Sequence, residues 1–149
     1  MGAGTGPWGG AGPLLLVPVP SARRATAARG HDPARRIALA AAAELRRRGV
    51  PARVLPVLRQ RRPVADQSGL GARERQVNLA GALVVASGAR RLLDEGPVVL
   101  VDDLLTTGAS LAEAARAVGA AGPAATGAAT GLRAAVVAPS PSAFEINRN

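Results

Sequence analysis

The sequence predicts an α/β domain in which a mainly parallel central sheet is flanked by helices. Two short apolar runs, Leu14–Val19 and Val98–Val101, have the length and composition of buried strands. A helical segment follows the first run and leads to a further strand candidate, and this order favours parallel pairing. With 149 residues and 48% hydrophobic residues, the chain is long enough for one packed core.

The first helix is predicted to run from Asp32 to about Arg48. Asp32 supplies a side-chain acceptor for the helix N-terminus, Pro33 has the φ angle of a first helical residue, and Gly49 ends the segment. Arg53–Leu58 is the next predicted strand. Together with the first strand, these elements make a βαβ unit.

The rest of the chain is predicted to continue this alternation. The polar, arginine-rich stretch Gln60–Asn78 is predicted to be a long loop, and such loops are usually functional or disordered. The remaining elements are a strand at Leu83–Val85, a turn or short helix at Gly88–Gly96, the strand Val98–Val101, a helix to about Val118, a linker at Gly119–Gly131 and a buried strand at Ala134–Ala138. The domain is predicted to span residues 13–139, between a flexible Gly-rich lead-in at 1–12 and a tail at 140–149.

Two residue types are missing from the sequence, and each absence excludes a class of site. Without cysteine there can be no disulfide framework, thiolate zinc site or cysteine nucleophile. Without lysine there is no G-K-[ST] motif, which excludes a P-loop ATPase. No signal peptide or membrane-spanning segment is predicted, so we expect a cytoplasmic protein that makes no membrane contact.

The formal charge of +9 is concentrated in the first half of the chain. Residues 21–75 hold 14 Arg and 4 acidic residues, whereas residues 76–149 hold 5 Arg and 6 acidic residues. A basic half favours nucleic acid or phosphate-rich ligands. Trp8 and Phe144 are the only aromatic residues, which is too few for base stacking along single-stranded DNA, so DNA binding would have to be electrostatic.

The segment Val98–Ser110, VVLVDDLLTTGAS, contains the strongest candidates for functional residues. Four apolar residues are followed by Asp102 and Asp103, and then by a small hydroxylic loop that opens a helix. In open parallel sheets, ligands bind at this carboxyl edge. The hydroxyls and glycine of Thr106–Ser110 let backbone N–H groups approach an anion at the positive end of the helix. The pattern therefore predicts a phosphate site.

Parts of this segment also fit roles that involve no phosphate. Ser110 and Glu113 match the capping box S-x-x-E, which is a purely structural use of that hydroxyl and acid. A cap does not explain Asp102 and Asp103. These two carboxylates could instead ligate a metal directly or cap the loop.

All thirteen residues of this segment resemble the signature with which type I phosphoribosyltransferases bind 5-phosphoribosyl diphosphate (PRPP). The resemblance implies a three-layer fold with a mainly parallel sheet and a long flexible loop. It also implies that the acidic pair binds the ribose 2′ and 3′ hydroxyls and that the loop binds the 5′-phosphate. The implied PRPP-binding residues are Asp102, Asp103, Leu104, Leu105, Thr106, Thr107, Gly108, Ala109 and Ser110.

Three further segments, VPVPSARR…ARGHD and QSGLGARERQVNLAGAL, resemble the ComF-type, competence-associated branch of that family. The N-terminal zinc-ribbon-like segment of many relatives has no counterpart in this sequence. The resemblance implies a mobile loop at Gln60–Asn78 that closes over the site. It implies a pyrophosphate loop formed by Pro18, Val19, Pro20, Ser21, Arg23 and Arg24.

The chemistry that this resemblance implies needs cations on the leaving group, because displacing pyrophosphate builds negative charge there. The expected catalytic residues are Asp102, Asp103, Arg73 and Arg75, with Arg29, Arg61 and Arg62 as further candidates. Mg²⁺ is expected to be carried by PRPP without direct protein ligands.

The expected function is therefore transfer of the 5-phosphoribosyl group from PRPP to a nitrogen acceptor, with release of pyrophosphate. The acceptor is expected to be a small molecule that the sequence does not specify, and a homodimer is left open. The alternative is a domain without enzymatic activity, either a PRPP or nucleotide sensor or an accessory factor in DNA uptake.

Overall fold

The computed structural model describes residues 11–21, 32–64, 69–105, 108–121 and 132–139. Their elements, in chain order, are β1 (Leu14–Pro18), α2 (Pro33–Arg47), β2 (Ala52–Val54), β3 (Leu58–Gln60), α3 (Ala72–Leu79), β4 (Leu83–Val85), α4 (Arg90–Leu93), β5 (Val98–Leu105), α5 (Ala109–Ala120) and β6 (Arg133–Pro139).

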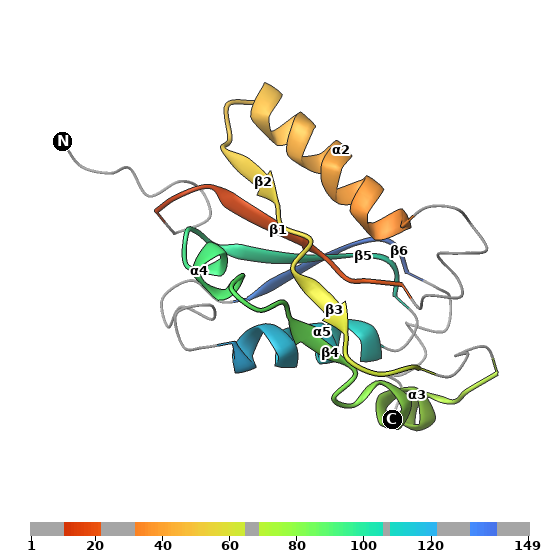
Figure 1. The fold of residues 1–149 in the computed structure, drawn as a ribbon. Helices are drawn as coiled ribbons and strands as arrows, with labels where there is room; N and C mark the ends of the chain where they lie inside the picture. Colours follow the sequence, from red (N-terminus) through yellow and green to blue (C-terminus); the bar gives the residue numbers. More distant parts are fainter. Residues whose placement is uncertain (1–10, 22–31, 65–68, 106–107, 122–131, 140–149) are drawn as a thin grey trace.

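The main sheet has four parallel strands in the order β2-β1-β5-β6. β1 lies in the middle, where Leu16 is in register with Val54 of β2 on one side and Val99 of β5 on the other. Helix α2 covers one face of this sheet and α5 lies on the opposite face (Figure 1). The prediction of an α/β fold with a mainly parallel sheet between helices is confirmed.

The core has two parts because alternate residues of β1 point to opposite faces. Leu14 and Leu16 pack in one cluster with Ala38 and Ala42 of α2. Leu15 and Val17 pack in the other cluster, which includes residues of α5, β3 and β4. All five residues of β1 are buried, as expected for a central parallel strand.

Helix α2 begins and ends as its capping residues predict. The backbone N–H of Arg35 donates to the Asp32 carboxylate at 3.3 Å, and Pro33 is the first helical residue. Gly49 has a φ of +79°, and its N–H donates to the Arg46 carbonyl at 3.0 Å. A residue with a side chain would be strained in that conformation, so the glycine ends the helix at low cost.

The predicted strand Arg53–Leu58 is wrong, because two short strands of different sheets occupy this region. The chain turns at Pro56, where the Val57 N–H donates to the Leu55 carbonyl at 2.9 Å across a three-residue turn. Pro56 has no N–H for a strand ladder, which favours a break at this residue. Leu58 then begins β3, which pairs antiparallel with β4.

Three other features differ from the prediction. The expected loop Gln60–Asn78 contains most of α3, so it is not a structureless segment. Helix α5 extends to Ala120 and includes the first two residues of the predicted linker. The last strand, β6, is predicted to be buried, but Ala134 and Ala135 are exposed because the strand lies at the end of the sheet order.

Candidate functional site

The strands that precede the two loops singled out by the sequence, β1 and β5, lie next to each other in the sheet. From β1 the chain crosses through α2 to β2 on one side, whereas from β5 it crosses through α5 to β6 on the other side. β1 and β5 are neighbours, so the strand order reverses between them (Figure 1). In parallel sheets, ligands bind at the carboxyl ends of strands at such a reversal. This edge of the sheet is the candidate site.

The carboxyl end of β1 supplies one side of the site. Pro18 is the last residue of β1, and the N–H of buried Val19 donates to the Val101 carbonyl of β5 at 2.8 Å. Pro20 and Ser21 follow and are half-buried. The other members of the predicted pyrophosphate loop, Arg23 and Arg24, lie outside the described residues, as does Arg29.

The acidic pair lies inside β5 and not after it, which corrects the predicted end of the strand at Val101. Asp102 is in register with Val136 of β6, and the strand continues through Leu104 and Leu105. These two leucines were expected in the phosphate loop, but their backbones pair with β6. The parallel ladder continues because β6 offers pairing partners as far as Pro139.

Asp102 is only 8% exposed, so its carboxylate is largely removed from water. Its Oδ1 accepts the backbone N–H of Asp103 at 2.9 Å. Burial, a hydrogen bond with the Asp103 side chain and the charges of Asp103 and Asp32 together raise the pKa of Asp102 to about 7. Asp32 caps α2, so this helix brings a third acid close to the pair. The site therefore favours cations or hydroxyl donors.

The start of α5 gives the candidate site a second side that is suited to an anion. Gly108 is the N-cap with a φ of +77°, followed by buried Ala109 and half-buried Ser110. The first amides of this helix point toward the carboxyl edge, as a phosphate cradle requires. Thr106 and Thr107 lie outside the described residues.

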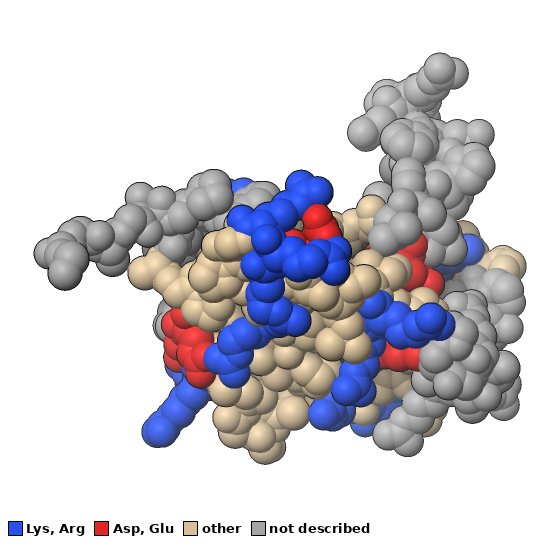
Figure 2. Space-filling model, turned by 90° about the horizontal axis from the view of Figure 1, so that it is seen from above, with Lys and Arg blue, Asp and Glu red and all other residues tan. Residues whose placement is uncertain are grey.

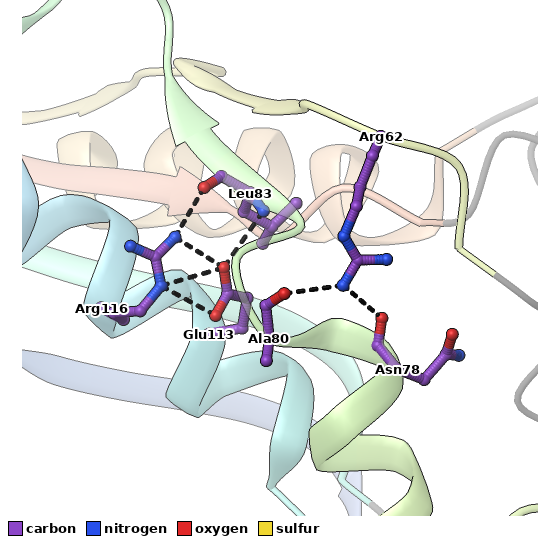
Figure 3. A network of polar contacts seen from close by, with 6 residues as sticks. All are labelled: Arg62, Asn78, Ala80, Leu83, Glu113 and Arg116. Carbon is purple, nitrogen blue, oxygen red and sulfur yellow. Dashed lines mark hydrogen bonds and ion pairs between the residues drawn. The ribbon is translucent and has the colours of Figure 1, made fainter.

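The capping box predicted for Ser110 and Glu113 is wrong. Gly108 is the N-cap, so Ser110 lies inside the first turn of α5. Glu113 instead accepts hydrogen bonds from the Leu83 N–H at 3.1 Å and from Arg116 Nη2 at 2.7 Å (Figure 3). The S-x-x-E spacing therefore does not mark a cap here, because the Glu113 side chain is buried beside β4.

Glu113 and Arg116 are the residues that the sequence interpretation missed. Glu113 is 5% exposed, on the same face of α5 as Ala109, Ala114 and Ala117. An acid among buried alanines at helical spacing was the available signal. Burial opposes ionisation, but Arg116 and the amides of Leu83 and Gly81 outweigh it and hold the pKa of Glu113 below its ordinary value.

The arginines predicted around Gln60–Asn78 have different surroundings. Arg62 contacts protein, since its Nη2 donates to the carbonyls of Asn78 at 2.8 Å and Ala80 at 2.6 Å (Figure 3). Arg73 and Arg75 belong to α3, which packs on α5 at the end of the molecule where β1 and β5 end (Figure 1). Arg75 Nε is buried and has no hydrogen-bond partner among the described residues.

Arginine side chains also spread over the face that α2 covers, which Figure 2 shows from above. Several of these arginines form ion pairs with nearby acids: Arg47 and Arg48 pair with Glu44, and Arg53 pairs with Glu95. Such exposed pairs contribute little to stability. Among the described residues of the first half, these arginines therefore lie on the surface and pair with nearby acids.

Within the described ranges, no group of three or more His, Cys, Asp or Glu side chains is arranged to hold a metal ion. None of the helices in that same part of the chain has the length and apolar character needed to cross a membrane. Comparison with protein-family models, curated proteins and solved structures finds no match to this chain.

Proposed function

We propose that this chain binds PRPP and transfers its 5-phosphoribosyl group to a nitrogen nucleophile, releasing pyrophosphate. The proposal rests on one observation. The acidic pair, the start of α5 and the end of β1 lie at the same edge of the sheet, where the strand order reverses between β1 and β5. Each of these parts suits one portion of PRPP. The proposal also draws on the resemblance of Val98–Ser110 to the PRPP signature.

The ribose 5-phosphate half would lie over β5 and α5. Ionised Asp102 and Asp103 accept hydrogen bonds from the 2′ and 3′ hydroxyls, which offsets the cost of holding two charges at a site where Asp102 is buried. The 5′-phosphate lies at the start of α5, where Gly108 leaves room for close backbone approach and the helix end favours an anion.

In the reaction, the nitrogen lone pair attacks C1 of the ribose and forms the new C–N bond. The C1–O bond breaks, its electron pair leaves with pyrophosphate, and positive charge develops on the ribose ring. Arg73 and Arg75 are proposed to stabilise the negative charge on the leaving group. Mg²⁺ bound to the diphosphate oxygens would neutralise part of the same charge.

A thermal-shift titration with PRPP and Mg²⁺ tests the binding half of this proposal. A ligand that binds only the folded state at one hundred times its Kd adds about 2.7 kcal/mol of stability, which corresponds to a rise of about 8 °C in Tm for a domain of this size. No rise in Tm at millimolar PRPP would contradict the proposed site.

The Asp103→Asn variant tests the ribose contact directly. Loss of a charge-assisted hydrogen bond costs about 1.5–3 kcal/mol, so we expect the PRPP affinity to fall by about tenfold to a hundredfold. Asp94→Asn removes an exposed acid at the end of α4 and serves as the matched control. Full PRPP affinity in the Asp103→Asn variant would show that the acidic pair does not hold the ribose.

The second candidate function is PRPP or nucleotide binding without group transfer. Pyrophosphate release measured with a panel of nucleobases and amines separates the two, because a sensor releases none with any acceptor. DNA binding through the arginines on the α2 face would be distinguished by salt (Figure 2). Affinity for DNA falls steeply as salt rises, whereas hydrogen bonding of the ribose to the acidic pair does not.

A further inference from the structure

Glu113 is a buried charge with several partners, although it lies outside the proposed PRPP contacts. Its carboxylate accepts the Leu83 N–H at 3.1 Å, Arg116 Nε at 2.9 Å and Arg116 Nη2 at 2.7 Å (Figure 3). Arg116, in contrast, has 48% of its side chain accessible to solvent. The pair therefore reaches from the surface of α5 into the core.

Glu113 and Arg116 together hold both polar groups of Leu83 in β4. In the antiparallel pairing with β3, the hydrogen bond next to Leu83 runs from the Arg61 N–H to the Ala82 carbonyl at 2.7 Å. Leu83 itself donates its N–H to Glu113 and accepts from Arg116 Nη2 at 2.8 Å. The two side chains therefore act where a neighbouring strand would otherwise be needed.

We call Glu113 and Arg116 the clamp. Its contacts with β4 also connect β3 and α3 to α5. Arg62, which follows β3, donates to the carbonyls of Asn78 and Ala80 at the C-terminal end of α3. β3, β4 and α3 are thus joined to one another, and the clamp joins them to α5 (Figure 3). Arg73 and Arg75 belong to α3, and the proposed phosphate site lies at the start of α5, so these contacts link the elements that carry the two groups.

We propose that Glu113 and Arg116 are positioning residues that hold α3, with Arg73 and Arg75, at the correct distance from the start of α5. The inference rests on the proposed function, since it assigns the pyrophosphate contacts to α3 and the ribose 5-phosphate contacts to β5 and α5. Loosening the clamp then weakens contacts to the diphosphate and leaves those to the rest of the ligand in place. The clamp residues do not touch the ligand.

The test compares the affinities of PRPP and ribose 5-phosphate, each with Mg²⁺, by isothermal titration calorimetry. Ribose 5-phosphate has no diphosphate, so the ratio of the two affinities reports the contribution of α3. We expect this ratio to be about tenfold or more in the wild type. Glu113→Gln and Arg116→Gln should each reduce it at least fivefold, with the affinity for ribose 5-phosphate changed by less than twofold. Arg91→Gln, which removes an exposed charge on α4, should leave the ratio unchanged.

The possible outcomes separate this inference from the proposed function. If the wild type binds neither ligand, both are overturned. If the wild type prefers PRPP and the clamp variants keep the full preference, only the positioning role is overturned. An equal loss of both affinities also overturns it, because that result indicates a merely structural role. Arg116→Gln alters a half-exposed side chain and decides the question if Glu113→Gln does not fold.

Discussion

The Asp102→Asn variant is expected to be more stable than the wild type at pH 8, and its advantage should shrink as the pH falls. Burial and the neighbouring acids raise the pKa of Asp102 to about 7 in the folded state, against 3.8 for the unfolded chain. Between these two values the folded state binds one proton more than the unfolded state. The free energy of unfolding of the wild type therefore falls by about 1.4 kcal/mol per unit as pH rises toward 7.

Between pH 5 and pH 8 this dependence amounts to about 3 kcal/mol, and it levels off above pH 7, where Asp102 is ionised in both states. Asparagine is neutral throughout and its Oδ1 can still accept the Asp103 N–H. Urea unfolding of wild type and variant at several pH values measures the difference directly. Asp94→Asn is the control for removal of an exposed acid. Parallel stability curves for wild type and Asp102→Asn would show that Asp102 is ionised at pH 5.

Gly96→Ala is expected to destabilise the fold on the order of 3 kcal/mol, because two backbone segments touch at this residue. A Cβ on Gly96 would overlap the carbonyl oxygen of Pro13, and one on Gly12 would overlap the carbonyl oxygen of Glu95. The contact comes just before the central strands β1 and β5 pair, where the Leu15 N–H donates to the Pro97 carbonyl at 2.8 Å. Separating the segments would strain that pairing.

Gly88→Ala is the matched control for the effect of adding a methyl group. Gly88 has a φ of +79°, and a methyl group on its Cα would meet no atom within 4 Å, so alanine there costs only the backbone strain of about 1 kcal/mol. Gly96 has no positive φ, so its alanine variant reports steric contact alone. Urea denaturation of both variants gives the two costs. A smaller loss for Gly96→Ala than for Gly88→Ala would contradict the close contact.

The elements that depend on short stretches of sequence could be predicted. The apolar run of β1 and the capping residues around α2 act locally, so their positions follow from the residues themselves. Asp102 and Asp103 could be singled out for the same reason, because they follow a buried run directly. The extension of β5 through them could not be predicted, since it depends on pairing with β6, which comes after α5 in the chain.

Features that depend on contacts between distant residues are described poorly by sequence patterns. Glu113 fits a capping box by spacing, yet its carboxylate accepts the N–H of Leu83, thirty residues earlier in the chain. Whether it caps α5 or supports β4 is decided by which element packs there. The helix α3 was missed because its residues are mostly polar and exposed, so it has no apolar stripe to reveal its period.

The alanines on the inner face of α2 limit how this protein can change through mutation. Ala34, Ala38 and Ala42 are fully buried, so any larger residue must push the helix away from the sheet. Glycine would remove a single methyl group from each position and weaken the helix. Substitutions that preserve this fold should therefore accumulate at exposed positions of α2 such as Arg35 and Arg36. Descendants of this chain should differ in surface charge far more than in core volume.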